Sequence, residues 1–271
     1  MKTSIRPKTL CLSLASLPLA SLCLLTSSGP LYAADWQYQL QAGVASLPRY
    51  SGSDERTVAP ILGGAIVSPY GVFLNTEQGL GWGHEWGDLA FSTWVGPSET
   101  RKDRKHGYKG SDHLAGMGSI KSRAQFGAHL GYTLGTVELG ATLQHALKKN
   151  DDHDTGSAYN HLQLSIGSTL YEGRYGRLEG SLNSQFGDGD YLRTWYGVSS
   201  AQADRTRFGA YRPKGGFLSR GGDLTWTVPV SEQMHLSTVL ALQYLGREAA
   251  DSPIVERRLQ TSLATTLEYS F

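Results

Sequence analysis

The chain has 271 residues, of which 39% are hydrophobic and 18% charged, with a formal net charge of +1. Glycine accounts for 33 residues and the charged share lies below the roughly 25% of an average domain, so an α-helical enzyme core is disfavoured. The near-neutral charge lacks the basic footprint of a nucleic-acid-binding domain, and we expect no nucleic-acid partner.

Residues 1–33 have the features of a secretory signal peptide. An apolar stretch over 10–25 is preceded by three basic residues, Lys2, Arg6 and Lys8. A small-residue cleavage site follows at Leu31-Tyr32-Ala33. We therefore expect an exported chain that is cut after residue 33.

Cleavage would change what the rest of the chain contains. Residues 34–271 would form one domain, in which 22 basic side chains stand against 24 acidic ones. Both cysteines, Cys11 and Cys23, would be removed. The exported chain would then have neither a disulfide framework nor a thiolate metal site.

Period-two alternation dominates the sequence after the signal peptide. Apolar side chains alternate with Gln, Gly, Ser and Thr over five segments, 36–44, 89–95, 124–134, 137–143 and 162–170. A strand shows this pattern when its two faces meet different surroundings. No apolar run in 34–271 reaches the 18 or so residues that a spanning helix needs.

Two architectures produce such strands. A soluble sandwich would bury the apolar face and carry charges on the other, but here the polar face is mostly uncharged. The segments also approach the roughly 9–11 residues of a tilted transmembrane strand. We therefore expect an all-β fold, a transmembrane antiparallel up-and-down β-barrel in the cell outer membrane, with apolar side chains toward lipid.

The N-terminal half is harder to divide into strands. Leu80 and Trp82 alternate with glycines, but Pro60 interrupts the segment 58–67. Proline lacks the donor that an ordinary central strand needs. We count about twelve strands, and ten if residues 58–84 contain fewer crossings.

Connection lengths place the two ends of the barrel. Short connections, expected to be periplasmic, lie at 133–136, 171–176 and 229–233. Long connections, expected to be external, lie at 98–123, 148–158, 187–214 and 246–256. An interfacial girdle of aromatic residues is expected at the short-turn end, formed by Trp36, Tyr38, Tyr132, Tyr171, Tyr175, Trp226, Tyr269 and Phe271.

A basic run marks the external segment 98–123. It consists of Arg101, Lys102, Arg104, Lys105, His106 and Lys109. Because Arg and Lys pair strongly with phosphate, one hypothesis is that the arginines and lysines of this run contact lipopolysaccharide. The alternative is an ordinary solvated loop, which is what such charge runs commonly form.

No set of residues predicts catalysis, a metal site or a cofactor. Four consecutive residues of one loop, Asp151, Asp152, His153 and Asp154, cannot all point at one ion, and they lack the glycine turn and twelfth-position Glu of a calcium loop. His129 and His161 fall on lumen-facing positions, where a hydrogen-bonded structural role is expected. The lumen-facing charges are few: Glu138, Arg177, Glu179 and Glu268. They do not form the opposed clusters of a selective pore.

The last segment is similar to the terminal strand of bacterial outer-membrane proteins. Apolar and aromatic side chains alternate with polar ones from Leu259 to Phe271, and Tyr269 lies two residues before the end. In those proteins the barrel-assembly machinery recognises the final aromatic residue. Tyr269 and Phe271 are therefore the expected assembly signal.

Several short stretches resemble the MltA-interacting protein (MipA)/OmpV family of outer-membrane proteins. They are Tyr50-Ser51-Gly52-Ser53-Asp54 with Pro60, Leu74-Asn75 with Gly79-Leu80-Gly81, Tyr196-Gly197-Val198-Ser199 with Ala203, and Ser252-Pro253-Ile254-Val255. The resemblance covers nearly all of residues 34–271. It implies no catalytic residues, because the family has none agreed.

The resemblance also implies a function, which residue spacing does not show. Its family name comes from a scaffolding role, in which a lytic transglycosylase is bridged to a bifunctional murein synthase. We expect a non-enzymatic scaffold for peptidoglycan enzymes whose surroundings are outer-membrane lipid and lipopolysaccharide. The alternatives are a narrow channel for small solutes and a surface-interaction protein that acts through its external loops.

Overall fold

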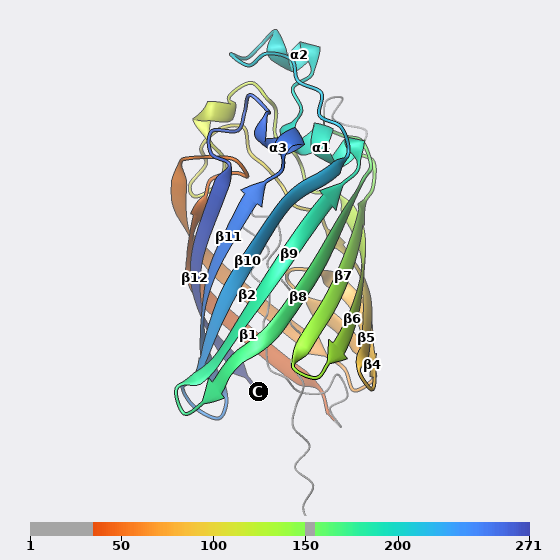
Figure 1. Ribbon diagram of the computed structural model, residues 1–271, viewed down its shortest axis with the longest axis vertical. Helices are drawn as coiled ribbons and strands as arrows, with labels where there is room; N and C mark the ends of the chain where they lie inside the picture. The colour runs from red at the N-terminus through yellow and green to blue at the C-terminus, as the bar shows by residue number, and fades with distance from the viewer. Residues whose placement is uncertain (1–34, 150–154) are drawn as a thin grey trace, which may run out of the picture.

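The computed structural model describes residues 35–149 and 155–271, which form one closed barrel (Figure 1). Its twelve strands are β1 Gln37–Pro48, β2 Arg56–Val67, β3 Val72–Asn75, β4 Gly79–Trp86, β5 Leu89–Pro97, β6 Ala124–Leu134, β7 Val137–Ala146, β8 Tyr159–Gly173, β9 Gly176–Gly187, β10 Gly216–Pro229, β11 Met234–Leu245 and β12 Leu259–Ser270. The described loops contain four short helices, η1 Asp112–Leu114, α1 Gly189–Tyr196, α2 Ser200–Ala203 and α3 Arg247–Ala250.

Each strand is antiparallel to the next along the chain, and β12 pairs with β1 from Gln39↔Ser270 to Ser46↔Leu263. This pairing closes the sheet, which lipid requires because an open edge cannot satisfy its backbone groups in hydrocarbon. The expected twelve-strand up-and-down barrel is confirmed for the part of the chain that the structure describes.

The two faces of the wall differ as the alternation predicted. In β8 the outward Leu164 is 44% exposed, whereas its neighbour Gln163 is 6% exposed toward the lumen. In β12 the outward Leu267 is 39% exposed and Glu268 is 4% exposed. A soluble sandwich would bury these leucines instead, so the apolar belt places the barrel in the outer membrane.

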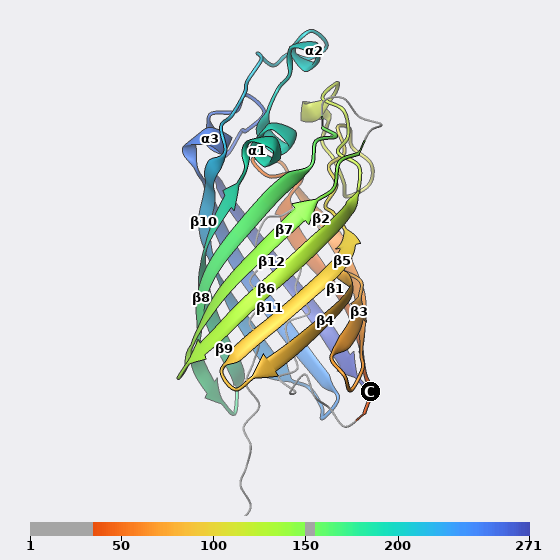
Figure 2. The same ribbon diagram turned by 90° about the vertical axis from the view of Figure 1, so that its right-hand side faces the viewer.

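None of the helices described is long and apolar enough to cross a membrane. All of them lie in connections at one end of the barrel, as the coiled ribbons in Figures 1 and 2 show. Period-two patterns do not reveal such helices, and the sequence did not predict them.

The two ends of the barrel differ in the predicted way. Strands β6 and β7 meet in a turn of two residues, as do β8 and β9. At the opposite end, β9 and β10 are joined by residues 188–215, and β5 and β6 by 98–123. The aromatic girdle at the short-turn end is present, with Tyr175 57% and Trp226 51% exposed on the outer surface. Long loops therefore mark the external end.

The wall departs from the expected pattern at the β3–β4 hairpin. The strand β3 has only four residues, and its pairing with β2 covers Ala65, Ile66 and Val67 (Figure 2). Above that level β2 is hydrogen-bonded only to β1 among the described strands. Pro60 lies in this part of β2, so its missing donor is tolerated because the strand is locally an edge.

Two large inward aromatic side chains, Phe73 and Trp94, lie opposite glycine residues. Trp94 of β5 is 4% exposed, and it lies across from Gly127 of β6. A Cβ atom on Gly127 would lie 2.0 Å from Trp94 Cε2, which no side chain could accommodate without displacing the indole. Part of the lumen is therefore filled by close packing.

Candidate functional site

The loops at the external end of the barrel pack against one another over its mouth. The helix α1 begins after Asp188, whose side chain accepts a hydrogen bond from Tyr191 N at 2.7 Å and so caps the helix. The buried face of α1 packs against both the wall and α3. The cluster comprises Ile120, Ala146, Tyr159, Tyr191, Leu192, Trp195, Tyr196, Leu218, Leu245 and Ala249.

A second buried cluster joins loops that are far apart in the sequence. It consists of Tyr50, Leu114, Met117, Val198, Phe208 and Ile254. These residues come from the β1–β2 connection, from 98–123, from 188–215 and from 246–258. Hydrophobic contact thus holds four connections together over the mouth.

Three of the stretches that carry the family resemblance meet at this place. Ser51 Oγ and Tyr196 Oη share a hydrogen bond of 2.7 Å, and Ser252 Oγ donates to Tyr196 O at 2.5 Å. Gly52 O accepts from the backbone of Glu256 at 2.7 Å. Gly52 has φ of 101°, and a Cβ there would lie 2.7 Å from Val255 Cγ2, so this close approach requires glycine.

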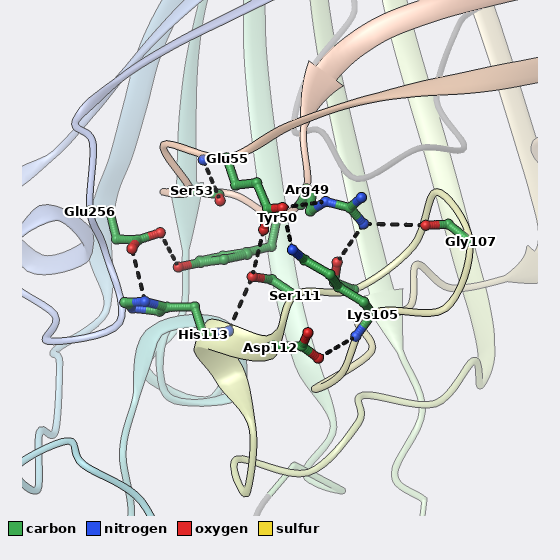
Figure 3. Close-up of polar contacts among 11 residues, drawn as sticks. Arg49, Tyr50, Ser53, Glu55, Lys105, Gly107, Ser111, Asp112, His113 and Glu256 are labelled. Atoms are coloured by element: carbon green, nitrogen blue, oxygen red, sulfur yellow. Dashed lines mark hydrogen bonds and ion pairs between the residues drawn. The ribbon is translucent and has the colours of Figure 1, made fainter.

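A polar network surrounds the second cluster, and Figure 3 shows its members. Tyr50 Oη lies 2.8 Å from Ile254 O and 3.0 Å from Glu256 Oε2. The other carboxylate oxygen of Glu256 is 2.8 Å from His113 Nδ1. The ring of His113 stacks on Tyr50 with a centroid distance of 6.1 Å. Tyr50, His113 and Glu256 thus link three of the loops at the mouth.

Burial and charge shift the pKa values of this network. Burial raises the pKa of Tyr50, and the nearby carboxylate of Glu256 raises it further. Burial lowers the pKa of His113, and Arg207 acts in the same direction, while Glu256 and Asp54 oppose the shift. The neutral imidazole is therefore the form that the closed mouth favours.

Ion pairs join the β1–β2 connection to the loop 98–123. Glu55 lies 3.2 Å from Arg49 Nε and 2.6 Å from Lys105 Nζ. Desolvation raises the pKa of Glu55, but Lys105 and Arg49 together outweigh it and lower the pKa. Ser111 Oγ donates to the same carboxylate at 3.3 Å. Arg49 also donates to Gly110 O at 3.1 Å. The loop is thereby fixed above the top of β1 and β2.

The structure separates the members of the basic run. Arg101 is 4% exposed and donates to Trp195 O at 2.5 Å, and burial lowers its pKa to about 10. Lys105 pairs with Glu55, and Arg104 is exposed. Lys102 and Lys109 line a cavity of about 220 Å³, together with Arg49, Arg101, Glu99, Pro97, Ser98, Thr100, Gly110 and Ser122.

The lumen below the mouth is polar. Arg177 lies 3.1 Å from Glu179, and Ser181 Oγ donates to Asp223 at 2.5 Å. His129 hydrogen-bonds Thr142 Oγ1 at 2.8 Å, in keeping with the expected structural role. Asp223 is a lumen-facing charge that the sequence analysis did not include.

No group of His, Cys, Asp or Glu is arranged to hold a metal ion within residues 35–149 and 155–271. The acidic run Asp151, Asp152, His153 and Asp154 lies outside the described residues. The stretches around Tyr50, Tyr196 and Ser252 are recognisable in the sequence one by one, but their meeting was not predicted, and neither His113 nor Glu256 was an expected site residue.

Comparison with known proteins identifies one family. The model of the family described as MltA-interacting protein MipA matches residues 40–271. No curated protein matches the chain.

Several solved outer-membrane barrels are also similar. OmpT of Vibrio cholerae has 9% identity, covering 88% of this chain and 97% of its own, with a TM-score of 0.39. An anion-selective porin from Comamonas acidovorans has 10% identity, 87% and 98% coverage, and a TM-score of 0.41. An outer-membrane channel from Pseudomonas putida F1 has 12% identity, 88% and 96% coverage, and a TM-score of 0.43.

Proposed function

Because the chain belongs to the MltA-interacting protein MipA family, we propose that it is a non-enzymatic outer-membrane adaptor for enzymes that cut and build peptidoglycan. The family match supports this proposal, since the description of the family names an interaction with MltA. The partners would be a lytic transglycosylase and a murein synthase, which act on the periplasmic side.

The packing of loops over the mouth is the structural observation that favours an adaptor over a channel. Two buried clusters and the network around Tyr50 occupy the external end. A partner in the periplasm would instead meet the opposite rim, which consists of short turns. Tyr70, at the turn between β2 and β3, is 80% exposed, and Val230, between β10 and β11, is 56% exposed. Exposed aromatic and apolar side chains of this kind suit a protein contact as well as a lipid headgroup.

Photocrosslinking from the rim tests the adaptor role in intact cells. A benzoylphenylalanine in place of Tyr70 or Glu232 is expected to capture a lytic transglycosylase or a murein synthase, identified by mass spectrometry. The same probe at Lys214, an exposed residue of the external loop 188–215, is the matched control and should capture neither. Equal capture from both ends, or no peptidoglycan enzyme from either rim position, would refute the proposal.

We also propose that Tyr269 and Phe271 form the assembly signal. Their rings lie edge to face with centroids 4.7 Å apart, and Phe271 N donates to Tyr38 O at 3.0 Å across the β12–β1 junction. Removing Phe271 should lower the yield of folded barrel in cells about tenfold, because the aromatic side chain would no longer be recognised, while refolding in detergent should change little. Heat-modifiable migration on gels measures both, and an unchanged cellular yield would contradict the assignment.

The polar lumen favours a second candidate, a narrow channel for small solutes. The pair formed by Arg177 and Glu179 and the hydrogen bond between Ser181 and Asp223 would line its path. A channel needs the mouth to open, and conductance separates the two candidates.

A further inference from the structure

The barrel wall has an opening beside the upper half of β2. The last contact of β2 with the β3–β4 hairpin is made by Gly64, whose backbone bonds to Thr76. No described strand pairs with Arg56–Gly63 on that side. The pairing of β4 with β5 ends at Leu80↔Val95, so in the closed strand order the next wall segment across the opening begins at Gly96 and continues over 96–102. We call the region between 56–63 and 96–102 the wall window.

The backbone of β2 presents unpaired groups to the wall window. The N–H and C=O of Gly64 both point toward Thr76, and alternate residues of a strand point the same way. Val58, Pro60 and Leu62 therefore direct their backbone into the window. Pro60 has no donor to leave unpaired, but Val58 and Leu62 each present an N–H and a C=O, which hydrocarbon alone cannot satisfy.

The outward side chains of the same strand are strongly exposed. Leu62 is 79% and Val58 is 67% exposed, compared with 65% for Leu182 in the fully paired strand β9. They form an apolar strip beside a polar edge, in the half of the wall nearer the external loops. An amphiphile could cover both surfaces. Its acyl chains would lie against the apolar strip, and its headgroup would hydrogen-bond the unpaired backbone edge of β2.

A cationic cavity lies at the upper rim of the wall window. This is the cavity of about 220 Å³ between Arg49, at the top of β1, and residues 97–102. Four of its lining residues are cations and one, Glu99, is an acid. Arg101 is 4% exposed and already donates to Trp195 O, so Lys102 and Lys109 are the lining cations that can reach a ligand. With these two lysines the cavity is suited to an anion with several acceptor oxygens.

We propose that the wall window and this cavity together bind one phosphorylated glycolipid of the outer leaflet. A phosphate lies in the cavity beside Lys102 and Lys109, and an acyl chain lies along Val58 and Leu62. The headgroup covers the backbone edge that no strand covers. This site is independent of the proposed adaptor role, because it lies at the external half of the wall and not at the periplasmic rim.

Native mass spectrometry of the refolded barrel with added lipid A that carries two phosphates tests the phosphate half. The double variant Lys102→Glu with Lys109→Glu is expected to weaken retention of lipid A about tenfold or more. The control, Lys148→Glu with Lys214→Glu, makes the same change in net charge on other external loops and should stay within about twofold of the parent. Heat-modifiable migration verifies that each variant is folded. An equal loss of lipid A retention in the two double variants would overturn the proposal.

A second experiment tests the lipid half without altering the charges. Benzoylphenylalanine in place of Leu62 should crosslink in outer membranes to a lipid of one defined mass. The same probe in place of Leu164 should give a clearly lower yield of that adduct. Capture of a second copy of the chain at residue 62 would show that the edge is a protein interface and would refute the site. Displacement of lipid A by millimolar inorganic phosphate would show that the cavity holds free phosphate, and would equally overturn the lipid assignment.

Discussion

An arginine on the lipid face of β8 is expected to destabilise the barrel by about 2–4 kcal/mol, because a cation near the middle of the bilayer has no partner there. The change Ile166→Arg places it at a residue that is 46% exposed on the outer surface and flanked by Leu139 and Leu182. Unfolding by denaturant in phospholipid vesicles, followed by tryptophan fluorescence, measures the loss.

The matched control is Gln163→Arg on the opposite face of the same strand. Gln163 is 6% exposed and faces the polar lumen, where polar neighbours can hydrogen-bond the guanidinium, so the loss should be smaller than at residue 166. Similar losses at residues 163 and 166, or a larger loss at 163, would mean that the two faces had been assigned the wrong way round.

Replacing the loop segment that carries α1 is expected to make a barrel that does not conduct ions into one that does. With residues 189–214 replaced by a short Gly-Ser linker between β9 and β10, the buried face of α1, including Leu192 and Trp195, would be lost. The polar lumen would then be open to the external side. In planar bilayers the parent protein should show no resolvable steps of ionic current. The variant should show stable current steps in most insertions.

A control for this experiment keeps the buried face of α1 and changes only exposed charges of the same loop. The double variant Arg205→Ser with Lys214→Ser should show no ionic conductance, because neither side chain belongs to the two buried clusters. Steady conductance by the parent protein would favour the channel over the adaptor. If the variant with residues 189–214 replaced did not conduct ions, packing below the mouth would also close the lumen.

Much of the wall could be predicted from the sequence because strand alternation is local. The pattern over 162–170 places Leu164 outside and Gln163 inside without knowledge of any partner strand. Pro60 also carried a correct signal, since it lies where β2 lacks a second neighbour. The four-residue length of β3 could not be predicted, because glycine-rich alternation over 79–83 does not reveal where pairing stops.

The mouth was beyond sequence reasoning for a different reason. Tyr50, His113 and Glu256 are separated by more than sixty residues each, and only the closure of the barrel brings them within hydrogen-bonding distance. For α1 a local signal did exist. Asp188 is a capping residue, and the buried residues that follow recur at helical spacing from Leu192 to Tyr196. That signal lies within the segment 187–214, for which the sequence analysis predicted only a long external loop.

Single-cysteine scanning of residues 162–167 tests most directly the claim that apolar side chains face lipid. Residues 34–271 contain no cysteine, so each substitution carries one fluorescent label. In vesicles with brominated acyl chains, labels at 162, 164 and 166 should be strongly quenched, and labels at 163, 165 and 167 only weakly. Quenching without alternation, or with the opposite alternation, would contradict the barrel described here.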